Sequence, residues 1–418
     1  MTENDRHVSI DAVRGFAVLG ILLMNIVGMG LPAMAYITPT YYGGHEGPNL
    51  WVWATNYVLA DGKMRALFTM LFGASLMLIA ERAEGQRPGP AAIHYRRVAW
   101  LFVFGMLHAY LLFFGDILVT YAIAGAIVFT MRKWPSAVLI GLGAVLLGLL
   151  VAKGLLETQH LVHLKEKAEA PGASEAARKI WEQQSFTLNP PASFGQSEIA
   201  GYRGDFWDAM KARAFIAFLL QTVFLVTETL WEVIAQMAIG IALYRMGFFT
   251  LGWKSRHYLL MMAIGYGVGV PILAWMAWRV SGAGFEPFLR QEMSYLAAIP
   301  RPFVALAHAS ALLLLVRSGA LQWLVSRLAA AGRMALSNYL GTSIITAFVF
   351  CGFGLGLFGR LERYQLYYVV AGVWLLILLW SKPWLSAFHY GPFEWLWRSL
   401  VRWRPQPFIK PQPPLASR

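Results

Sequence analysis

Cysteine is almost absent from this sequence: the only copy is Cys351, within an apolar stretch. A single cysteine excludes an internal disulfide framework and any zinc site built on cysteine ligands, and we expect no metal. Charged residues are also scarce, at 14% of 418 residues, whereas hydrophobic residues make up 58%. So few charges cannot cover an ordinary soluble protein of this size, and we therefore expect a lipid-facing exterior.

Motifs of soluble nucleotide-binding proteins are missing as well. The chain contains no P-loop, no dinucleotide-binding fingerprint and no repeat of the soluble type. Its formal net charge is +13, but Lys and Arg lie in short clusters between apolar runs and not on one basic face. This arrangement favours membrane topology over nucleic-acid binding, so we expect no nucleic-acid partner.

Long apolar runs predict an all-α fold, a polytopic transmembrane helical bundle of about ten spans that forms a single domain over residues 1–418. The first run is longer than a usual signal-peptide core, so we expect it to remain as an uncleaved helix. The run 214–243 is too long for one straight helix and is tilted, broken or two helices. The predicted spans are 10–34, 66–80, 98–114, 117–131, 137–152, 214–243, 258–278, 302–316, 338–358 and 366–381.

The distribution of Lys and Arg predicts that both termini are cytoplasmic. With the amino terminus inside, the inner loops hold most of the basic clusters, and a single crossing by residues 214–243 preserves this pattern. The polar connection 153–213 is then extracytoplasmic, with a surface helix interrupted at Pro171-Gly172. Residues 382–418 form a basic, proline-rich cytoplasmic tail.

The most informative stretch places His108 shortly before a turn at Gly115-Asp116. Two apolar runs meet at this turn, which predicts a tight antiparallel hairpin at the outer surface. At ~1.5 Å per residue, His108 lies roughly 10 Å below that surface. Burying an imidazole inside the membrane costs free energy, so such a histidine usually has a hydrogen-bond partner or a functional role. Chemically, an imidazole can exchange a proton or attack an acyl group. The alternative is a histidine bonded to another helix, with Asp116 capping the next one; the nearby acid favours function.

A second polar group, Asp61, Lys63 and Arg65, lies at the outer end of the second span. These residues are either interface anchors or the polar wall of an outward-facing cavity near His108. Glu228 and Glu232 are four residues apart, so we expect them to share a helix face. The full set of candidates for this cavity is Asp61, Lys63, Arg65, His45, Asn25, Glu228 and Glu232.

The cytoplasmic side carries a third group. Asp11 and Arg14 are three residues apart, so they form either a local salt bridge or part of an ordered inner mouth. The basic residues on this side receive an anionic cofactor or face anionic lipid. The candidates for a cofactor at the inner mouth are Asp11, Arg14, Arg96, Arg97, Arg333 and Asn338.

Ordered motifs over nearly the whole chain resemble the YeiB family of bacterial inner-membrane proteins. They are the opening helix 8–26, Gly62-Lys63 with 71–74, His108 with 115–118, and the segments 332–340 and 391–398. Only the long outer connection lacks a recognisable signature. The resemblance implies a multi-pass protein of the bacterial inner (plasma) membrane.

The opening Asp-x-x-Arg-Gly helix is also similar to that of the lysosomal heparan-α-glucosaminide N-acetyltransferase. This wider resemblance implies a transmembrane acyltransferase that uses a histidine to pass an acyl group from cytoplasmic acyl-CoA to an acceptor across the bilayer. By the family motif the role transfers to His108, with Asp116 beside it. The heparan enzyme has its histidine in the loop after the opening helix, where this chain has His45 in a poorly matching context.

Our leading hypothesis is therefore acyl transfer, with acyl-CoA as donor and a small molecule or glycan as acceptor. In it His108 activates the acceptor or carries the acyl group, and Asp116 orients the imidazole. The choice between an acyl-histidine relay and direct transfer stays open. The alternatives are a transporter of a small solute or lipid, and a scaffold that assembles with other membrane proteins or as a homo-oligomer in the lipid.

Overall fold

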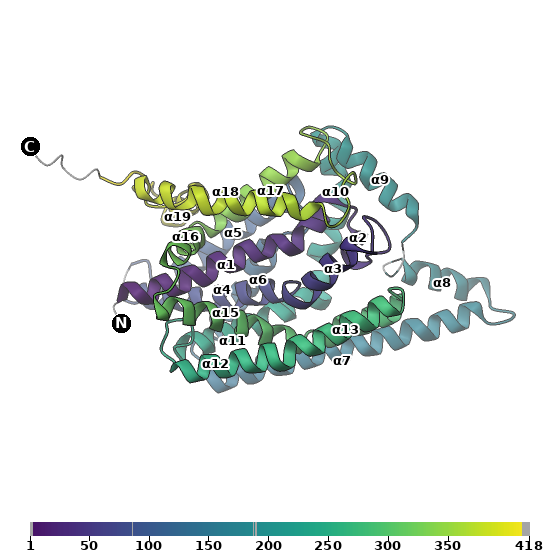
Figure 1. The fold of residues 1–418 in the computed structure, drawn as a ribbon, viewed down its shortest axis with the longest axis horizontal. Helices are drawn as coiled ribbons and strands as arrows, with labels where there is room; N and C mark the ends of the chain where they lie inside the picture. Colours follow the sequence, from purple (N-terminus) through teal and green to yellow (C-terminus); the bar gives the residue numbers. More distant parts are fainter. Residues whose placement is uncertain (1–2, 86, 187, 189, 412–418) are drawn as a thin grey trace, which may run out of the picture.

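The computed structural model describes residues 3–85, 87–186, 188 and 190–411, and this part of the chain is built of helices without a strand. Most helices run side by side along the long axis of the molecule (Figure 1). The predicted all-α membrane bundle is confirmed as a fold class. In the first half of the chain the helices are α1 (Glu3–Gly30), α2 (Met34–Ile37), α3 (Pro48–Leu59), α4 (Lys63–Arg82), α5 (Pro90–Leu111), α6 (Leu118–Thr130), α7 (Ser136–Glu169), α8 (Glu175–Ser185) and α9 (Ala192–Arg203).

The second half contains two π-helical segments, η1 and η2, each inside a longer helical run. The run 214–243 is one continuous helix, in which η1 joins α10 to α11. The elements are α10 (Phe206–Leu219), η1 (Leu220–Thr229), α11 (Leu230–Arg245), α12 (Ser255–Ile264), η2 (Gly265–Gly269), α13 (Val270–Gly282), α14 (Pro287–Leu296), α15 (Pro300–Ser318), α16 (Gln322–Arg333), α17 (Ala335–Phe350), α18 (Leu366–Ala387) and α19 (Pro392–Arg402).

Seven helices of the described residues are long and apolar enough to cross a membrane, and α6 and α17 are apolar but shorter. Each of the ten predicted runs overlaps a helix or a continuous helical run, and the run 98–114 overlaps α5. The number of crossings and the side of each terminus stay predictions. The seven are Val8–Gly30, Pro48–Arg82, Ser136–Glu169, Phe206–Arg245, Ser255–Gly282, Pro300–Ser318 and Leu366–Ala387.

Two predicted spans are wrong at their carboxy-terminal ends. The first helix stops at Gly30, because Pro32 follows and cannot donate a backbone hydrogen bond to continue it. The helix of the predicted span 338–358 ends at Phe350, and the glycine-rich segment after it is a loop that contacts α9. There the Gly352 N–H donates to the Tyr202 carbonyl at 2.8 Å.

Glycines let the central helices pack backbone to backbone. A Cβ on Gly332 of α16 would lie 1.9 Å from the Asp11 carbonyl oxygen of α1, and a Cβ on Gly240 of α11 would lie 2.0 Å from that of Met70 in α4. Neither contact tolerates a side chain, and small residues allow this close approach between membrane helices. One contact joins α16 to α1 and the other joins α11 to α4, and α1, α4 and α16 each contribute residues to the cavity described below.

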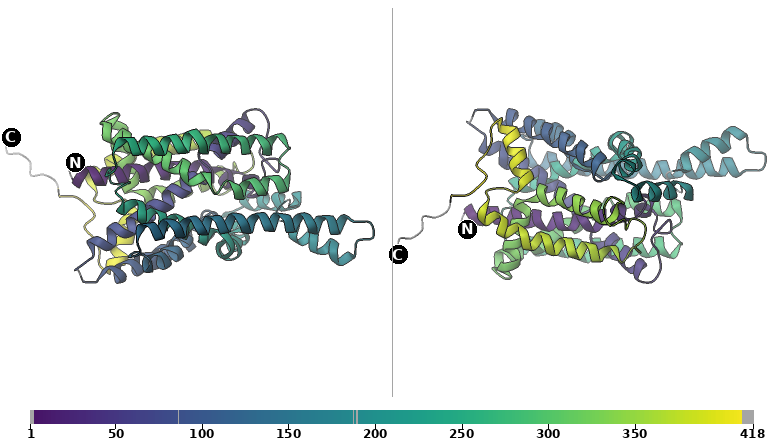
Figure 2. Two further views of the ribbon diagram at one scale, coloured as in Figure 1. Left: turned by 90° about the horizontal axis from the view of Figure 1, so that it is seen from below. Right: turned by 90° about the horizontal axis from the view of Figure 1, so that it is seen from above.

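The connection 153–213 is mostly helical. α7 continues far beyond the predicted span and, with α8, reaches past the rest of the bundle (Figure 2). The predicted break at Pro171-Gly172 is confirmed, since α7 ends at Glu169 and α8 begins at Glu175. α9 lies across the same end of the bundle, where both Glu198 carboxylate oxygens accept from the Ala33 N–H at 3.3 Å.

The carboxy-terminal segment 382–418 is only partly extended. Residues 382–387 are the end of α18, and α19 follows after a short turn. Residues 404–411 are extended, and Ile409 pairs with Phe388 in an isolated antiparallel bridge. The last residues of the predicted tail, 412–418, lie outside the described residues.

Docking of α9 is expected to depend on pH through Glu198. Burial raises the pKa of this carboxyl from 4.5 to about 7. When the pKa of a group is higher in the folded state than in the unfolded state, protonation of that group stabilises the folded state. This stabilisation is complete at pH values below the pKa of the unfolded state, and it is lost as the pH rises through the pKa of the folded state. We expect hydrogen-exchange protection of residues 192–203, corrected for intrinsic rates, to fall between about pH 5 and pH 8. In Glu198→Gln the protection should be independent of pH; an equal fall in both proteins would contradict the assignment.

Candidate functional site

His108 is the centre of a buried array of three side chains. Its Nδ1 atom lies 2.7 Å from Asp116 Oδ1, and its Nε2 atom lies 2.8 Å from Ser343 Oγ. The side chains of His108 and Asp116 are fully buried, and Ser343 is 1% exposed. The three residues come from α5, the turn after it, and α17, so the array joins two distant parts of the chain.

Local sequence accounts for the position of Asp116. α5 ends at Leu111 and α6 begins at Leu118, which confirms the predicted hairpin. Asp116 Oδ2 accepts from the Val119 N–H at 2.9 Å and so caps the start of α6, while Oδ1 holds the imidazole. The Asp116 carboxylate therefore both caps α6 and binds His108, and the capping bond fixes the carboxylate in the position from which it orients the imidazole.

The three groups have the order hydroxyl, imidazole and carboxylate. When Nδ1 donates to Asp116, Nε2 has a lone pair for the Ser343 hydroxyl proton. This is the arrangement in which an imidazole activates a hydroxyl nucleophile and a carboxylate stabilises the resulting imidazolium. The array can therefore support acyl transfer or proton exchange.

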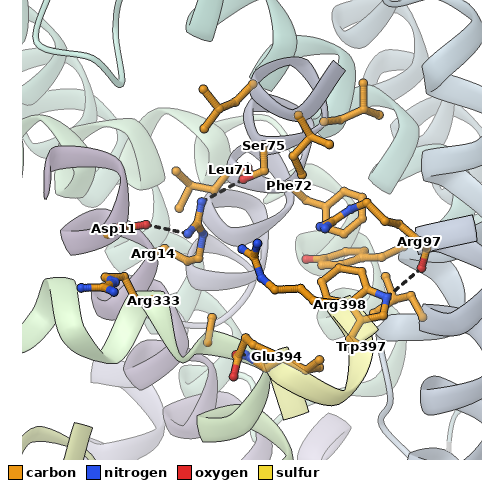
Figure 3. Close-up of a pocket in the computed structure, with 18 of the residues that line it drawn as sticks. Asp11, Arg14, Leu71, Phe72, Ser75, Arg97, Arg333, Glu394, Trp397 and Arg398 are labelled. Carbon is orange, nitrogen blue, oxygen red and sulfur yellow. Dashed lines mark hydrogen bonds and ion pairs between the residues drawn. The ribbon is translucent and has the colours of Figure 1, made fainter. Parts of the chain in front are cut away.

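A cavity of about 430 Å³ leads from one end of the bundle toward this array. The basic end of the cavity, its mouth, is lined by residues of α1, α4, α5, α16 and α19. α1 begins at this end of the bundle (Figure 1). Figure 3 shows Arg14 and Arg398 pointing into this space, with Arg97 and Trp397 at its wall. The basic residues of the lining are Arg14, Arg82, His94, Arg97, Arg333, His389 and Arg398.

The guanidinium groups at the mouth differ in how they are held. Arg14 forms an ion pair with Asp11 at 2.7 Å and donates to Ser75 Oγ at 2.9 Å. Arg97 and Arg398 instead lie over aromatic rings, at 4.0 Å from the centroid of Trp397 and 4.6 Å from that of Tyr390. Neither of these two forms an ion pair within the described residues. The mouth thus has positive charge left for an anionic ligand.

Glu394 of α19 also lines the cavity, and its carboxylate is already engaged in hydrogen bonds. Its carboxylate accepts from the backbone N–H groups of Leu336 and Ser337 at 2.6 and 3.0 Å, and from Ser337 Oγ at 2.5 Å. Burial raises its pKa, although these hydrogen bonds act in the opposite direction. Glu394 therefore caps α17 and fixes α19 against it, which positions Trp397 and Arg398 at the cavity.

The inner part of the cavity is mostly apolar and includes Tyr339. The ring of Tyr339 lines the cavity and also lies against His108, with ring centroids 4.9 Å apart. His108 itself is not part of the lining, so Tyr339 separates the cavity from the array. The Tyr339 hydroxyl donates to no acceptor among the described residues. The other inner residues are Phe68, Leu71, Phe72, Leu101, Leu118 and Tyr121.

The polar group predicted at the outer end of the second span is separate from His108. Asp61 accepts from the Tyr36 hydroxyl at 2.5 Å, Lys63 donates to the Tyr57 carbonyl, and Arg65 pairs with Glu232 at 3.0 Å. A cleft beside Asp61 and Tyr36 has only about 20 Å³, room for one water molecule. The expected contact between Asp61 or Lys63 and His108 is absent from the described residues.

Glu228 and Glu232, four residues apart in the sequence, bind different partners. Glu228 accepts from the Tyr295 hydroxyl of α14 at 2.8 Å and lies 3.6 Å from Lys153 of α7, whereas Glu232 faces Arg65 of α4. Glu228 lies near the end of the π-helical segment η1 and Glu232 lies in the first turn of α11, so the two carboxylates bind partners on different neighbouring helices.

The remaining candidates lie outside the cavity. His45 is in an exposed loop, 3.9 Å from Glu46, and Asn25 lies within α1. Arg96 faces the Trp403 ring at 6.0 Å. Asn338 donates to the Ala331 carbonyl and Ser381, and accepts from Trp380, so it joins α16, α17 and α18. No group of three His, Cys, Asp or Glu ligands for a metal occurs among the described residues.

Several residues of the site were missed from the sequence. Ser343 carries a weak signal, because it is one of several small polar residues in an otherwise apolar run. Arg398 was noticed only as part of the resemblance in 391–398, in a segment assigned to a tail. The sequence separation of 235 residues between His108 and Ser343 explains why no local pattern joins them.

Comparisons with known proteins agree on the family and name no activity. Residues 243–404 match a family described as "Protein of unknown function (DUF418)". The chain is 33% identical over 409 residues to "Uncharacterized protein YeiB" of Escherichia coli (strain K12), which covers 95% of this chain and 96% of that protein. It is 27% identical over 423 residues to "Uncharacterized protein YxaH" of Bacillus subtilis (strain 168), with 97% of each covered. No solved structure matches the chain significantly.

The position of Tyr339 between cavity and array is testable by cysteine labelling. In a Cys351→Ala background, Ser343→Cys should react slowly with a small water-soluble thiol reagent, because Tyr339 closes the path. Adding Tyr339→Ala should raise the labelling rate by about tenfold or more, whereas Tyr339→Phe should not. Ser75 lines the cavity, so Ser75→Cys should react rapidly whether position 339 is Tyr, Ala or Phe. Equal labelling of Ser343→Cys in all three proteins would show that Tyr339 is not the barrier.

Proposed function

This chain belongs to the YeiB-like family of membrane proteins, and from that premise we propose that it transfers an acyl group from acyl-CoA to an acceptor across the bacterial inner membrane. The observation that supports the proposal is a cavity with a basic mouth and an apolar inner part, whose lining includes Tyr339, the residue that lies against His108. This cavity matches a donor that has an anionic head and an apolar reactive arm. The head would bind at the basic mouth, and the arm would occupy the apolar inner part. The mouth faces the cytoplasm in this proposal, as the charge distribution predicts.

The basic mouth suits the phosphates of coenzyme A. Arg97 and Arg398 have no ion-pair partner among the described residues, and guanidinium groups bind phosphate through two parallel hydrogen bonds. Trp397 and Tyr390 hold these two side chains in place, which limits the entropy lost when a ligand binds. The nucleotide then stays at the mouth, where Arg82 and Arg333 are exposed.

The apolar inner part suits the pantetheine arm and the acyl group. A volume of about 430 Å³ is within the range of small-molecule sites, ~300–1,000 Å³, and is too small for a whole coenzyme A with its nucleotide. Phe68, Phe72 and Leu101 surround this space without charge. The thioester would therefore lie at the deep end, next to Tyr339.

The His108 array supplies the chemistry in this proposal. The imidazole removes a proton from the attacking hydroxyl or amine and returns it to the thiolate of coenzyme A as that group leaves, and Asp116 stabilises the cation formed in between. The acceptor, a small molecule or glycan, approaches from the outer face. Coenzyme A is too highly charged to cross a bilayer, so a buried array allows cytoplasmic thioesters to drive chemistry on the other side.

Ligand binding tests the mouth separately from the chemistry. Arg97→Gln should weaken binding of coenzyme A to the purified protein by about ten- to a hundredfold, since a hydrogen bond to a charged group contributes roughly 1.5–3 kcal/mol. The matched control is Arg96→Gln, because Arg96 is the adjacent residue and lies outside the cavity lining. Calorimetry in detergent or nanodiscs measures both. Equal weakening by the two changes, or none by Arg97→Gln, would contradict the assignment of the mouth.

Turnover tests the array. His108→Ala should reduce consumption of acyl-CoA by about a hundredfold or more while leaving coenzyme A binding intact, because a positioned general base contributes ~10²–10⁴ in rate. His45→Ala, a change of the same type in an exposed loop, should keep wild-type turnover. Free thiol release from a series of acyl-CoA chain lengths is the measurement. Wild-type turnover in His108→Ala, or no turnover by the wild-type protein with any chain length, would remove the proposal.

A further inference from the structure

Ser343 differs from three other buried hydroxyl groups of the membrane helices in the partner of its shortest contact. Thr69, Thr346 and Ser381 each donate to the carbonyl oxygen four residues earlier, at 2.7 to 2.9 Å. This is the usual partner of a serine or threonine inside a helix. Ser343 lies 3.5 Å from the corresponding oxygen of Tyr339 but 2.8 Å from His108 Nε2, so its short contact is to the imidazole.

The structure assigns to Ser343 the role of the nucleophile that carries the acyl group as an oxygen ester between the donor and the acceptor. This inference rests on the proposed acyl transfer and decides how it proceeds. A serine hydroxyl is a weak nucleophile unless a base takes its proton, and here the base is in hydrogen-bond contact with it. The base is oriented in turn by Asp116, which is held by the Val119 N–H.

Ser343 is also close to the proposed path of the thioester. Tyr339 lies one helical turn before it on α17, lines the cavity and touches His108. A rotation of the Tyr339 side chain would therefore open the deep end of the cavity onto the Ser343 hydroxyl. The Tyr339 hydroxyl, which donates to no described acceptor, is available to stabilise negative charge on the thioester oxygen.

The reaction balances in two steps. Ser343 Oγ attacks the thioester carbonyl as His108 takes its proton; the carbon–sulfur bond breaks, and His108 returns the proton to the thiolate, which releases coenzyme A and leaves acyl-Ser343. The acceptor hydroxyl or amine then attacks the ester as His108 takes its proton. The bond to Ser343 Oγ breaks, the serine recovers the proton from His108, and the acylated acceptor leaves.

A covalent intermediate of this kind suits transfer across a membrane. Donor and acceptor never have to occupy the site together, because only the acyl group passes from one to the other. An oxygen ester is also less reactive toward water than an acyl-imidazole, so it can persist until an acceptor arrives. The buried position of Ser343, at 1% exposure, protects the ester from hydrolysis.

The experiment is to trap the intermediate in the full-length protein. Wild-type protein in nanodiscs is incubated with radiolabelled acetyl-CoA without an acceptor, quenched in acid and analysed by peptide mass spectrometry. We expect release of coenzyme A in a burst that approaches the amount of protein, and an acetyl ester on the peptide that contains Ser343. Ser343→Ala should lose both the label and turnover, by about a hundredfold or more, while binding coenzyme A as the wild type does.

Two variants separate nucleophile from structure. Ser343→Cys keeps a nucleophile and should still be acylated, now as a thioester that neutral hydroxylamine cleaves. Ser310→Ala is the matched control, because Ser310 is fully buried in α15 and its hydroxyl has no hydrogen-bond partner in the described part of the chain. It should keep wild-type burst and turnover.

The outcomes distinguish this inference from the proposed function. Full turnover in Ser343→Ala beside an active wild type, or acyl label on His108 in place of Ser343, would overturn the role of Ser343 and leave acyl transfer standing. A wild type that releases no thiol from acyl-CoA of any chain length would overturn both. Loss of label and turnover in Ser343→Ala, together with acylation of Ser343→Cys, would support the assignment.

Discussion

The structure depends on the need to pair polar side chains in a helical interior that water does not reach. An unpaired imidazole or guanidinium in such a place is expensive, and the membrane helices of this chain meet that constraint with specific partners. His108 is held between Asp116 and Ser343, and Arg65 is held by Glu232. Because Asp116 also caps α6, one carboxylate sets both the geometry of the hairpin and the orientation of the imidazole.

The cavity stands out against this background because its basic groups are not fully paired by acids. Arg14 has Asp11, but Arg97 and Arg398 rest on aromatic rings, and Glu394 uses its carboxylate to cap α17. The same contacts that place α19 at the mouth therefore leave positive charge for a ligand. A basic mouth continuous with an apolar interior is the feature that favours a phosphorylated donor with an apolar arm over a purely polar solute.

Prediction from the sequence was most successful where the relevant residues are close together in the chain. The hairpin and the pairing of His108 with Asp116 follow from apolar runs that meet at a turn, and the ion pair of Asp11 with Arg14 follows from a separation of three residues. The separate partners of Glu228 and Glu232 could not be predicted, because Lys153, Tyr295 and Arg65 lie on other helices far away in the chain. The outer group around Asp61 was identified correctly as polar, but its distance from His108 depends on how α4 packs, which no local pattern encodes.

The sequence by itself determined that the chain is an all-helical membrane protein of the YeiB-like family, and that His108 lies inside the bundle beside an acid. Those properties follow from hydrophobic length, from the position of one turn and from motifs read along the chain. Only the tertiary structure decided that Ser343 completes the array, that Tyr339 closes the cavity and that α19 contributes Arg398 to the mouth. These contacts join residues more than two hundred positions apart, and they depend on helices brought together backbone to backbone at glycines such as Gly332 and Gly240, a packing arrangement that composition and periodicity do not specify.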